Sequence, residues 1–265
     1  MPQSGPKSPP GIEVRGRLAV WSPLGGPQPR VQMLVTTRHG GVSSSPWDTL
    51  NLSPSTGDER EDVEANRQRL QDDTGMPTPR WLHQVHGDVV VDAADLGAIP
   101  GGTLQADGLW TQENDVALAV GIADCVPIFL WDRSGARIAV VHAGWRGTAK
   151  RIVQRGIEVL RAAGSQRQDL RLTLGPSIGP CCYEVGGMVT QKLPSESIRR
   201  EAHGTYADLR AANRIVALES GLEAHQIDPD PPCTACHTDW FFSHRRQGPA
   251  TGRMWAVAWL RGAGA

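Results

Sequence analysis

The sequence has no excess of charge of either sign and no long apolar run. Its 265 residues include 27 basic and 28 acidic ones, which leaves a formal net charge of −1. Electrostatic binding of nucleic acid or of an anionic membrane needs a surplus of basic residues. A membrane-spanning helix needs about 18 consecutive apolar residues, and no segment of the chain has them. We therefore expect no nucleic-acid partner and no membrane partner.

The sequence also lacks a secretory signal and an even set of cysteines. Residues 1–12 are rich in proline and contain no apolar signal segment, so we expect a disordered tail followed by a single domain over 13–265. The five cysteines are an odd number, and Cys181 and Cys182 are adjacent. Neither feature fits the disulfide framework of a secreted protein. These absences predict reduced thiols and a cytoplasmic location.

Short runs rich in Val, Ile and Leu predict strands, and amphipathic stretches predict a few helices. The strands between 88 and 141 are separated by gaps too short for crossover helices, which favours antiparallel neighbours in one sheet region. Helices lie outside that block, so we expect an α+β fold in which helices cover sheets. The predicted strands are 32–36, 88–92, 116–121, 126–131, 137–141, 170–175 and 254–260, and the predicted helices are 58–73, 148–163 and 206–220.

Three residues at predicted strand ends form a candidate metal site: His86, Cys125 and His142. One Cys and two His can hold a zinc ion and leave one coordination position free, as catalytic zinc sites do. The same residues could instead act without a metal, with Cys125 as nucleophile and a histidine as base. His83 competes with His86, because residues three apart on an extended segment face opposite sides.

Two arginines are candidates for binding an anionic part of a substrate. Arg38 lies in a Gly-rich loop after a predicted strand, and this loop lacks the Gly-Lys-Ser/Thr ending of a P-loop. Arg146 lies in the turn after His142, where a predicted helix begins and backbone N–H groups favour an anion. Ordinary turns are the alternative at both places. We expect Arg38 and Arg146 to contact phosphate or a ribose hydroxyl.

A second set of cysteines has no assigned role. Cys233, Cys236 and His237 match the C-x-x-C-H pattern of covalent haem attachment, but that attachment accompanies export and no export signal is present. A zinc ribbon needs a second cysteine pair, and the adjacent Cys181 and Cys182 do not have the spacing of such a pair. Structural, redox-sensitive and incidental roles stay open for these four residues.

Eight segments, in order, resemble the bacterial polyphenol-oxidase or laccase-domain family, whose members are also described as multifunctional purine nucleoside phosphorylases. The resemblance extends from about Thr36 to Leu260 and implies a single four-layer α/β/β/α domain with mixed, largely antiparallel sheets. It also implies that the metal ligands are His86, Cys125 and His142. The segments are TTRHGGVSSSPWDTLNL, LHQVHG, ADGLWT, GIADCVPIFLWD, VVHAGWRG, GPSIGPCCYEVG, DLRAANRIV and CTACHTDWFFSHRRQGPATGRMWAVAWL.

The function that the resemblance implies is a zinc-dependent purine nucleoside phosphorylase acting on adenosine, inosine, guanosine and methylthioadenosine, with adenosine deaminase activity. Relatives described as peptidoglycan editing factors imply an alternative, a Cys/His amidohydrolase that removes serine from a cell-wall precursor. A non-enzymatic redox or metal-binding protein is a further alternative. The substrates would be small molecules, purine nucleosides and phosphate, and the oligomeric state stays open.

The older name of this family, multicopper laccase, fits the residues poorly. Multicopper oxidases bind copper mostly through pairs of histidines separated by one residue, and the eight histidines here form no such pair. A Cys/His₂ ligand set suits zinc. Copper could still bind adventitiously, because its intrinsic affinity for such ligands exceeds that of zinc. A polyphenol oxidase with copper is therefore kept only as an alternative.

Overall fold

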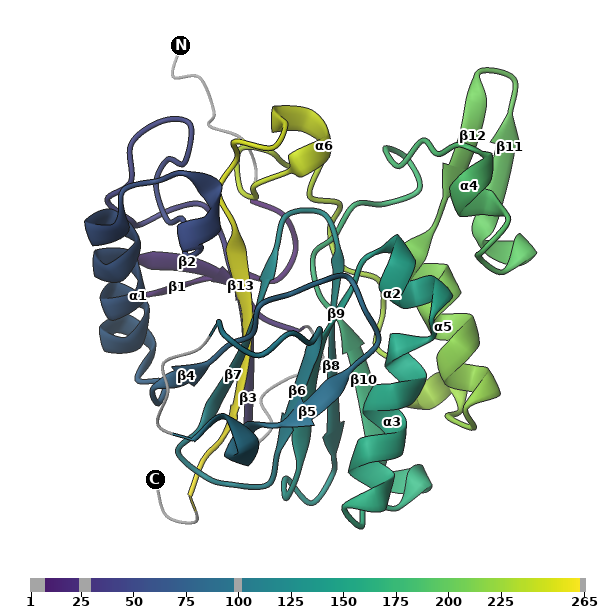
Figure 1. Cartoon of the computed structure of the whole chain (residues 1–265), viewed down its shortest axis with the longest axis horizontal. Helices are drawn as coiled ribbons and strands as arrows, with labels where there is room; N and C mark the ends of the chain where they lie inside the picture. The colour runs from purple at the N-terminus through teal and green to yellow at the C-terminus, as the bar shows by residue number, and fades with distance from the viewer. Residues whose placement is uncertain (1–7, 24–29, 98–101, 263–265) are drawn as a thin grey trace.

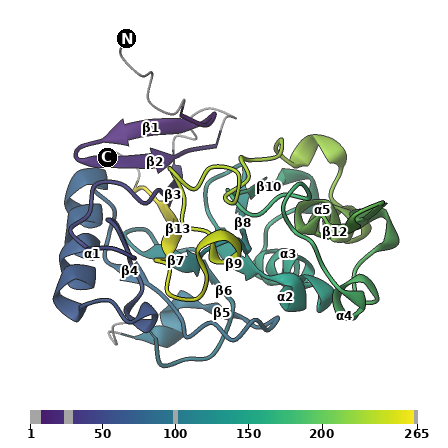
Figure 2. The same ribbon diagram turned by 90° about the horizontal axis from the view of Figure 1, so that it is seen from above.

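Two β-sheets pack face to face, and helices cover the outer face of each (Figure 1 and Figure 2). The computed structural model describes residues 8–23, 30–97 and 102–262. α1 (Arg60–Thr74) covers one sheet, while α3 (Ile152–Ala162) and α5 (Leu209–Glu219) cover the other. This arrangement confirms the predicted α/β/β/α layers. Of the predicted tail, residues 1–7 lie outside the described residues, and the first strand begins at Ile12.

The first sheet has six strands in the order β1-β2-β3-β13-β7-β4. All neighbours pair antiparallel except β4 and β7, which run parallel. The strand β13 lies between β3 and β7, so the C-terminal strand joins two segments that are distant in the sequence (Figure 1). The strands are β1 (Ile12–Arg15), β2 (Leu18–Trp21), β3 (Val31–Thr36), β4 (Pro79–Arg80), β7 (Ala117–Ile122) and β13 (Met254–Leu260).

The second sheet has five strands in the order β10-β8-β9-β6-β5. Here β5 and β6 are parallel and the remaining neighbours are antiparallel. Both sheets are therefore mixed and largely antiparallel, as expected. The strands are β5 (Val90–Asp92), β6 (Gly108–Thr111), β8 (Val126–Asp132), β9 (Ile138–Ala143) and β10 (Leu170–Leu174).

The apolar core has three layers, because alternate side chains of a strand point to opposite faces. In β8, Phe129 points into the layer between the sheets, whereas Ile128 and Leu130 point toward α3 and α5. A third layer joins the first sheet to α1 through residues such as Leu34 and Leu70. Central strands are thus buried on both faces, and this explains their continuous apolar runs.

One prediction about the central strands was wrong. β7 and β8 do not form a hairpin in one sheet, since β7 belongs to the six-stranded sheet and β8 to the five-stranded one. The short connection 123–125 crosses between the sheets instead of reversing within one, and Asp124 takes a positive φ of 88° there. The partner of β9 on its other side is β6, a strand that the sequence analysis did not predict. Cys125 consequently lies at the crossover between the two sheets.

Two predicted helices also differ from the structure. The predicted helix 148–163 is divided into α2 (Trp145–Ala149) and α3, because Arg151 between them has a φ of 64°, which a right-handed helix does not accept. The predicted helix 206–220 starts later, since Tyr206 belongs to β12 (Gly204–Ala207). Asp208 then caps α5 by accepting hydrogen bonds from the next turn.

The remaining elements lie near the rim of the sheets. β11 (Ile198–Glu201) and β12 form a two-stranded arm beside α4 (Gly187–Thr190), and α6 (His244–Gln247) lies above the sheets (Figure 1). Among the described residues, no helix combines the length and the apolar character that a membrane crossing requires. Short 3-10 helices are η1 (Pro54–Thr56), η2 (Ala93–Leu96), η3 (Arg167–Asp169), η4 (Ser195–Ser197) and η5 (Ala224–Gln226).

Candidate active site

The structure brings His86, Cys125 and His142 together beside the crossover between the sheets. Their ligand atoms all lie within 4.8 Å of one another. Strand register explains the approach of two of them, because β8 begins directly after Cys125 and its second residue, Pro127, pairs with His142 of β9. His86 comes from the loop before β5, and its ring lies edge-on to that of His142 with centroids 4.9 Å apart.

His83 does not reach this group. Its backbone forms an isolated bridge with Gln105, and its side chain is exposed. The side chain of His86 points toward Cys125 and His142. The backbone at His86 has a φ of 58°, which bends the chain at this point. Of the two candidate histidines, His86 thus lies beside Cys125, and His83 lies outside the group.

Asp107 organises the site, although the sequence pattern gives no signal for it. Its buried carboxylate accepts backbone hydrogen bonds from Val85 (3.1 Å), His86 (2.9 Å) and Gly87 (2.6 Å). It also lies 2.8 Å from Nδ1 of His142, and the backbone carbonyl of Asp107 accepts from the His142 N–H. One carboxylate thus fixes both the loop of His86 and the ring of His142. The Nε2 atom of His142 is left for Cys125 or a metal.

The charges of the site favour a thiolate beside a protonated imidazole. Burial alone would raise the pKa of Cys125, but the charge and hydrogen bond of His142, followed by those of His86, lower it from 9.0 to about 6. Burial alone would lower the pKa of His142, but Cys125 and Asp107 raise it from 6.5 to about 9. Near neutral pH, Cys125 is therefore a good metal ligand or nucleophile.

A second carboxylate, that of Asp124 directly before Cys125, binds the C-terminal loops through hydrogen bonds. Asp124 is buried and accepts hydrogen bonds from the hydroxyls of Thr234 (2.6 Å) and Ser243 (3.0 Å) and from the backbone of Arg245 (2.7 Å). The guanidinium of Arg245 lies 5.0 Å from the centre of the Tyr183 ring. Segments far apart in the sequence therefore border Cys125.

Gly144 leaves room for the three ligands. A Cβ atom at this position would lie 3.0 Å from Sγ of Cys125 and 3.0 Å from Cδ2 of His86, closer than ordinary contact allows. Thiolate and imidazole donors with no side chain between them suit a borderline-soft ion such as zinc. The three residues present therefore fit a metal with three protein ligands.

The two predicted anion-binding arginines have different surroundings. Arg38 donates to Asp48 and to the carbonyl of Thr238, and its guanidinium lies over the ring of Phe242. It lines a cavity of about 610 Å³ that His86, Cys125 and His142 do not line. Arg146 is exposed and stacks on Trp145. Within the described residues its guanidinium has no hydrogen bond or ion pair to the protein, so it is available to a ligand.

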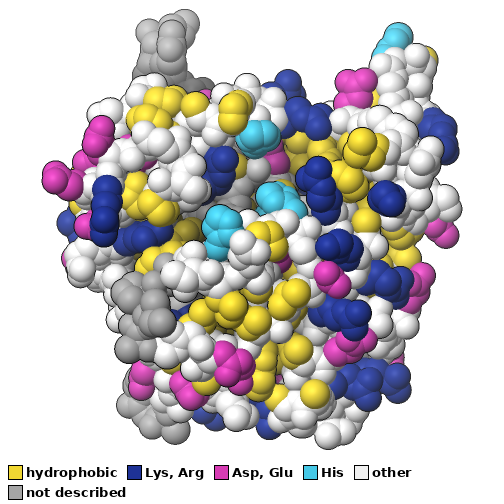
Figure 3. All heavy atoms as spheres, viewed as in Figure 1, with side chains coloured by type: hydrophobic (Ala, Val, Ile, Leu, Met, Phe, Trp, Pro, Cys, Tyr) yellow, Lys and Arg dark blue, Asp and Glu magenta, His cyan; other side chains and the backbone are white. Residues whose placement is uncertain are grey.

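The face that carries these elements has a hollow near its centre. Figure 3 shows histidine side chains gathered around this hollow, with Lys and Arg side chains along its rim. A basic rim favours a substrate or co-substrate with negative charge. Of the three candidate ligands, His86 is exposed, Cys125 is half-buried and His142 is buried.

Comparison with known proteins places the chain in a family. Residues 32–261 match the family described as multi-copper polyphenol oxidoreductase laccase. The chain belongs to this family. The match includes both sheets except for β1 and β2, so it extends through the whole candidate site of this laccase-family protein.

Relatives of this laccase-family chain carry another name. "Purine nucleoside phosphorylase YlmD" of Geobacillus stearothermophilus is 40% identical over 243 residues, covering 84% of this chain and 87% of the relative. "Purine nucleoside phosphorylase YfiH" of Escherichia coli is 36% identical over 242 residues, covering 88% and 96%. The crystal structure of YlmD from G. stearothermophilus superposes with a TM-score of 0.86 and 34% identity, covering 95% of this chain and 99% of that one.

Proposed function

We propose that this protein is a zinc-dependent purine nucleoside phosphorylase. The observation that carries the proposal is the convergence of His86, Cys125 and His142. Gly144 borders Cys125 and His86, and two residues after it comes Arg146, whose guanidinium makes no hydrogen bond or ion pair within the described residues. The names of the relatives support the same activity. The proposed substrates are adenosine, inosine, guanosine and methylthioadenosine, with inorganic phosphate as co-substrate and deamination of adenosine as a second activity.

The proposed metal is zinc, held by His86, Cys125 and His142. When bound there, zinc would supply a Lewis acid with a free coordination position for substrate. The family description mentions copper, but one thiolate and two imidazoles in a chain without His-x-His pairs suit zinc better. Adventitious copper binding remains compatible with this ligand set.

The protein's own groups prepare the site in three ways. Asp107 holds the proton on Nδ1 of His142, so that Nε2 can act as a ligand or accept a proton. The low pKa of Cys125 keeps its sulfur charged at neutral pH. Arg146 would bind the phosphate that attacks C1′ of the ribose as the purine leaves. Arg38 would contact a ribose hydroxyl or phosphate from the cavity that it lines. We give it the weaker role, because its guanidinium already donates to Asp48 and to the carbonyl of Thr238.

One observation favours a second candidate function, a Cys/His amidohydrolase that releases serine from a peptidoglycan precursor. Cys125, His142 and Asp107 are arranged as nucleophile, base and orienting carboxylate, which is the arrangement of thiol hydrolases. In this alternative the thiolate attacks a carbonyl carbon and needs no metal. The two functions therefore differ in product and in metal dependence.

The test of the proposed function is a product assay with matched variants. We expect the protein to form ribose 1-phosphate from adenosine and phosphate, and Cys125→Ala and His86→Ala to reduce this rate by at least about 100-fold with a parallel loss of zinc. His83→Ala is the control, because it removes a histidine from the same loop that lies outside the site, and it should keep both rate and zinc.

Other outcomes of the same assay lead to other conclusions. Release of serine from a serine-bearing muramyl nucleotide, at a rate independent of zinc and abolished by thiol alkylation, would support the amidohydrolase. Inosine formed without phosphate would reveal the deaminase activity. A Cys125→Ala protein that retains near-normal phosphorolysis would place the active site elsewhere.

A further inference from the structure

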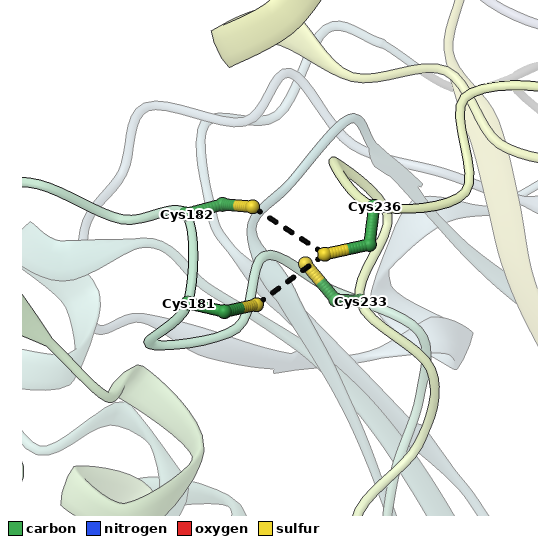
Figure 4. A group of neighbouring side chains, drawn as sticks. All are labelled: Cys181, Cys182, Cys233 and Cys236. Carbon is green, nitrogen blue, oxygen red and sulfur yellow. Dashed lines mark hydrogen bonds between the residues drawn. The ribbon is translucent and has the colours of Figure 1, made fainter.

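Four cysteines that the proposed function does not use gather at one point, as Figure 4 shows for Cys181, Cys182, Cys233 and Cys236. Their sulfur atoms all lie within 4.8 Å of one another. Sγ of Cys236 is 3.4 Å from that of Cys181 and 3.5 Å from that of Cys182. All four are free thiols. Two loops about fifty residues apart therefore bring four soft ligands together.

Hydrogen bonds within the protein hold the two loops in register. Residues Ser177 and Cys233 form a parallel bridge, and the N–H of Thr234 donates to the Ser177 carbonyl at 3.0 Å. The buried guanidinium of Arg210 donates to the Ser177 hydroxyl (2.9 Å) and to the carbonyls of Pro231 (2.7 Å) and Pro232 (2.8 Å). The positions of the thiols are thus set by a scaffold beneath them.

The scaffold also supplies the kind of hydrogen bonds that metal-bound thiolates accept. The N–H of Gly179 donates to Sγ of Cys233 at 3.1 Å, and Arg246 approaches Sγ of Cys182 at 3.4 Å. Such N–H donors stabilise the negative charge of bound thiolates.

We propose that Cys181, Cys182, Cys233 and Cys236 bind one zinc ion in a closed structural site. Four thiolates at about 2.3 Å from a tetrahedral zinc lie about 3.8 Å from one another. The distances of 3.4 and 3.5 Å from Sγ of Cys236 to those of Cys181 and Cys182 are close to that value. A single disulfide would use only two of the four sulfurs. An iron–sulfur cluster would spread its four thiolates over different iron atoms, and the grouping here is too compact for that.

Adjacent cysteines can share an ion here because they lie in a turn. The N–H groups of Cys182 and Tyr183 both donate to the carbonyl of Gly179, at 3.0 and 3.1 Å. In an extended strand adjacent side chains would point to opposite faces, whereas this turn lets both sulfurs approach Cys236. The sequence spacing, which differs from that of a zinc ribbon, therefore does not prevent a four-cysteine site.

The site would fix the loops that border Cys125. Thr234, between Cys233 and Cys236, donates to the carboxylate of Asp124, and Tyr183 follows Cys182 directly. A metal that joins the two cysteine loops would hold both of these residues in place. Its role is structural, because four protein ligands leave no coordination position for a substrate.

The test is the metal content of the full-length protein, purified without added metal, and of single-cysteine variants. We expect about two zinc ions per wild-type chain and about one in each of Cys236→Ala and Cys125→Ala. The matched pair separates the sites: Cys236→Ala should lose the four-cysteine ion and Cys125→Ala the other. About one zinc ion per wild-type chain, retained in Cys236→Ala and lost in Cys125→Ala, would overturn the proposal.

Cobalt spectroscopy covers the possibility that Cys236→Ala does not fold. After zinc is replaced by Co²⁺ in the wild-type protein and in Cys125→Ala, we expect both to show the strong sulfur-to-cobalt absorption of a tetrathiolate site. Its persistence in Cys125→Ala distinguishes it from the one-thiolate site at His86 and His142. Absence of that absorption, or a Cys181–Cys236 disulfide found by mass spectrometry in protein kept under reductant, would refute the four-cysteine zinc site.

Discussion

Single residues at the candidate active site are constrained by what surrounds them, and Gly144 shows this most directly. It precedes α2 with an ordinary extended conformation, so its backbone does not require glycine. The constraint is space, because a methyl group there would press on Cys125 and His86 at once. The thiolate and the imidazole could not both keep their positions beside such a group.

The substitution Gly144→Ala should therefore weaken metal binding without unfolding the protein. We expect the zinc affinity of the site to fall about 10-fold to 100-fold, the range typical when residues that orient ligands are changed, measured by competition with a chelator. Gly186→Ala is the matched control: Gly186 also precedes a short helix in an extended conformation, and no atom of the described residues lies within 4 Å of its added Cβ. Equal affinities in both variants would contradict this account of Gly144.

Residue types and their places near strand ends were enough to propose Cys125, His142 and one of His83 and His86 as a group, and the family resemblance selected His86. They did not indicate the residues that support this group. Asp107 gives no local signal, since its partners lie about 20 and 35 residues away. The four clustered cysteines were missed for a related reason. Their grouping depends on a turn and on the buried Arg210, neither of which a spacing pattern describes.

At the scale of elements, the start of β6 controls the loop that presents His86. The two oxygens of the Asp107 carboxylate, just before β6, each accept two hydrogen bonds: Oδ2 from Val85 and Gly87, Oδ1 from His86 and His142. The backbone at 85–87 has no regular secondary structure to hold it. The hydrogen bonds of the Asp107 carboxylate therefore fix the backbone of this loop, as strand pairing fixes the backbone of the sheets.

The substitution Asp107→Asn tests this positioning role. In either orientation of the amide, its NH₂ group replaces an oxygen that accepted two N–H donors, so buried donors lose their partners. We expect the free energy of unfolding to fall by about 1–3 kcal/mol and the zinc affinity by about 10-fold or more. Asp92→Asn, at the end of the neighbouring β5, should change neither quantity. Among the described residues, the carboxylate of Asp92 accepts a hydrogen bond only from the exposed N–H of Ala94. Unchanged zinc affinity in Asp107→Asn would reject the positioning role.

Predicted elements were accurate where the apolar pattern was continuous. All seven predicted strands are present, with ends shifted by at most two residues. The errors lie where strand pairing over long sequence distances determines the sheet. β7 pairs with β13 and so belongs to the six-stranded sheet, and β6 was too short to recognise from the sequence. The break at Arg151 depends on a single positive φ, for which the helical pattern of 148–163 gives no signal.

At the scale of the whole molecule, the candidate active site lies where the chain passes from one sheet to the other. Cys125 follows the last residues of β7 and precedes β8, while His142 is the penultimate residue of β9 in the second sheet. A metal bound to both therefore joins the crossover to the second sheet. Because the ligands come together only in the folded chain, metal binding should add to the stability of the entire fold.

That added stability should depend on pH in a defined direction. Between about pH 6 and pH 9, Cys125 is already a thiolate and His142 still carries a proton, which the incoming metal must displace. Raising the pH removes this competition, so affinity should increase about tenfold, and zinc-dependent stability by about 1.4 kcal/mol, per pH unit. The measurement is the change in the free energy of unfolding on adding zinc, taken for the wild type and for Cys125→Ala. The difference between these two changes is used, because any contribution of the four other cysteines cancels in it. Above about pH 9 the gain should level off. A difference that stays flat, or falls, between pH 6 and pH 9 would show that His142 is not protonated in the metal-free protein.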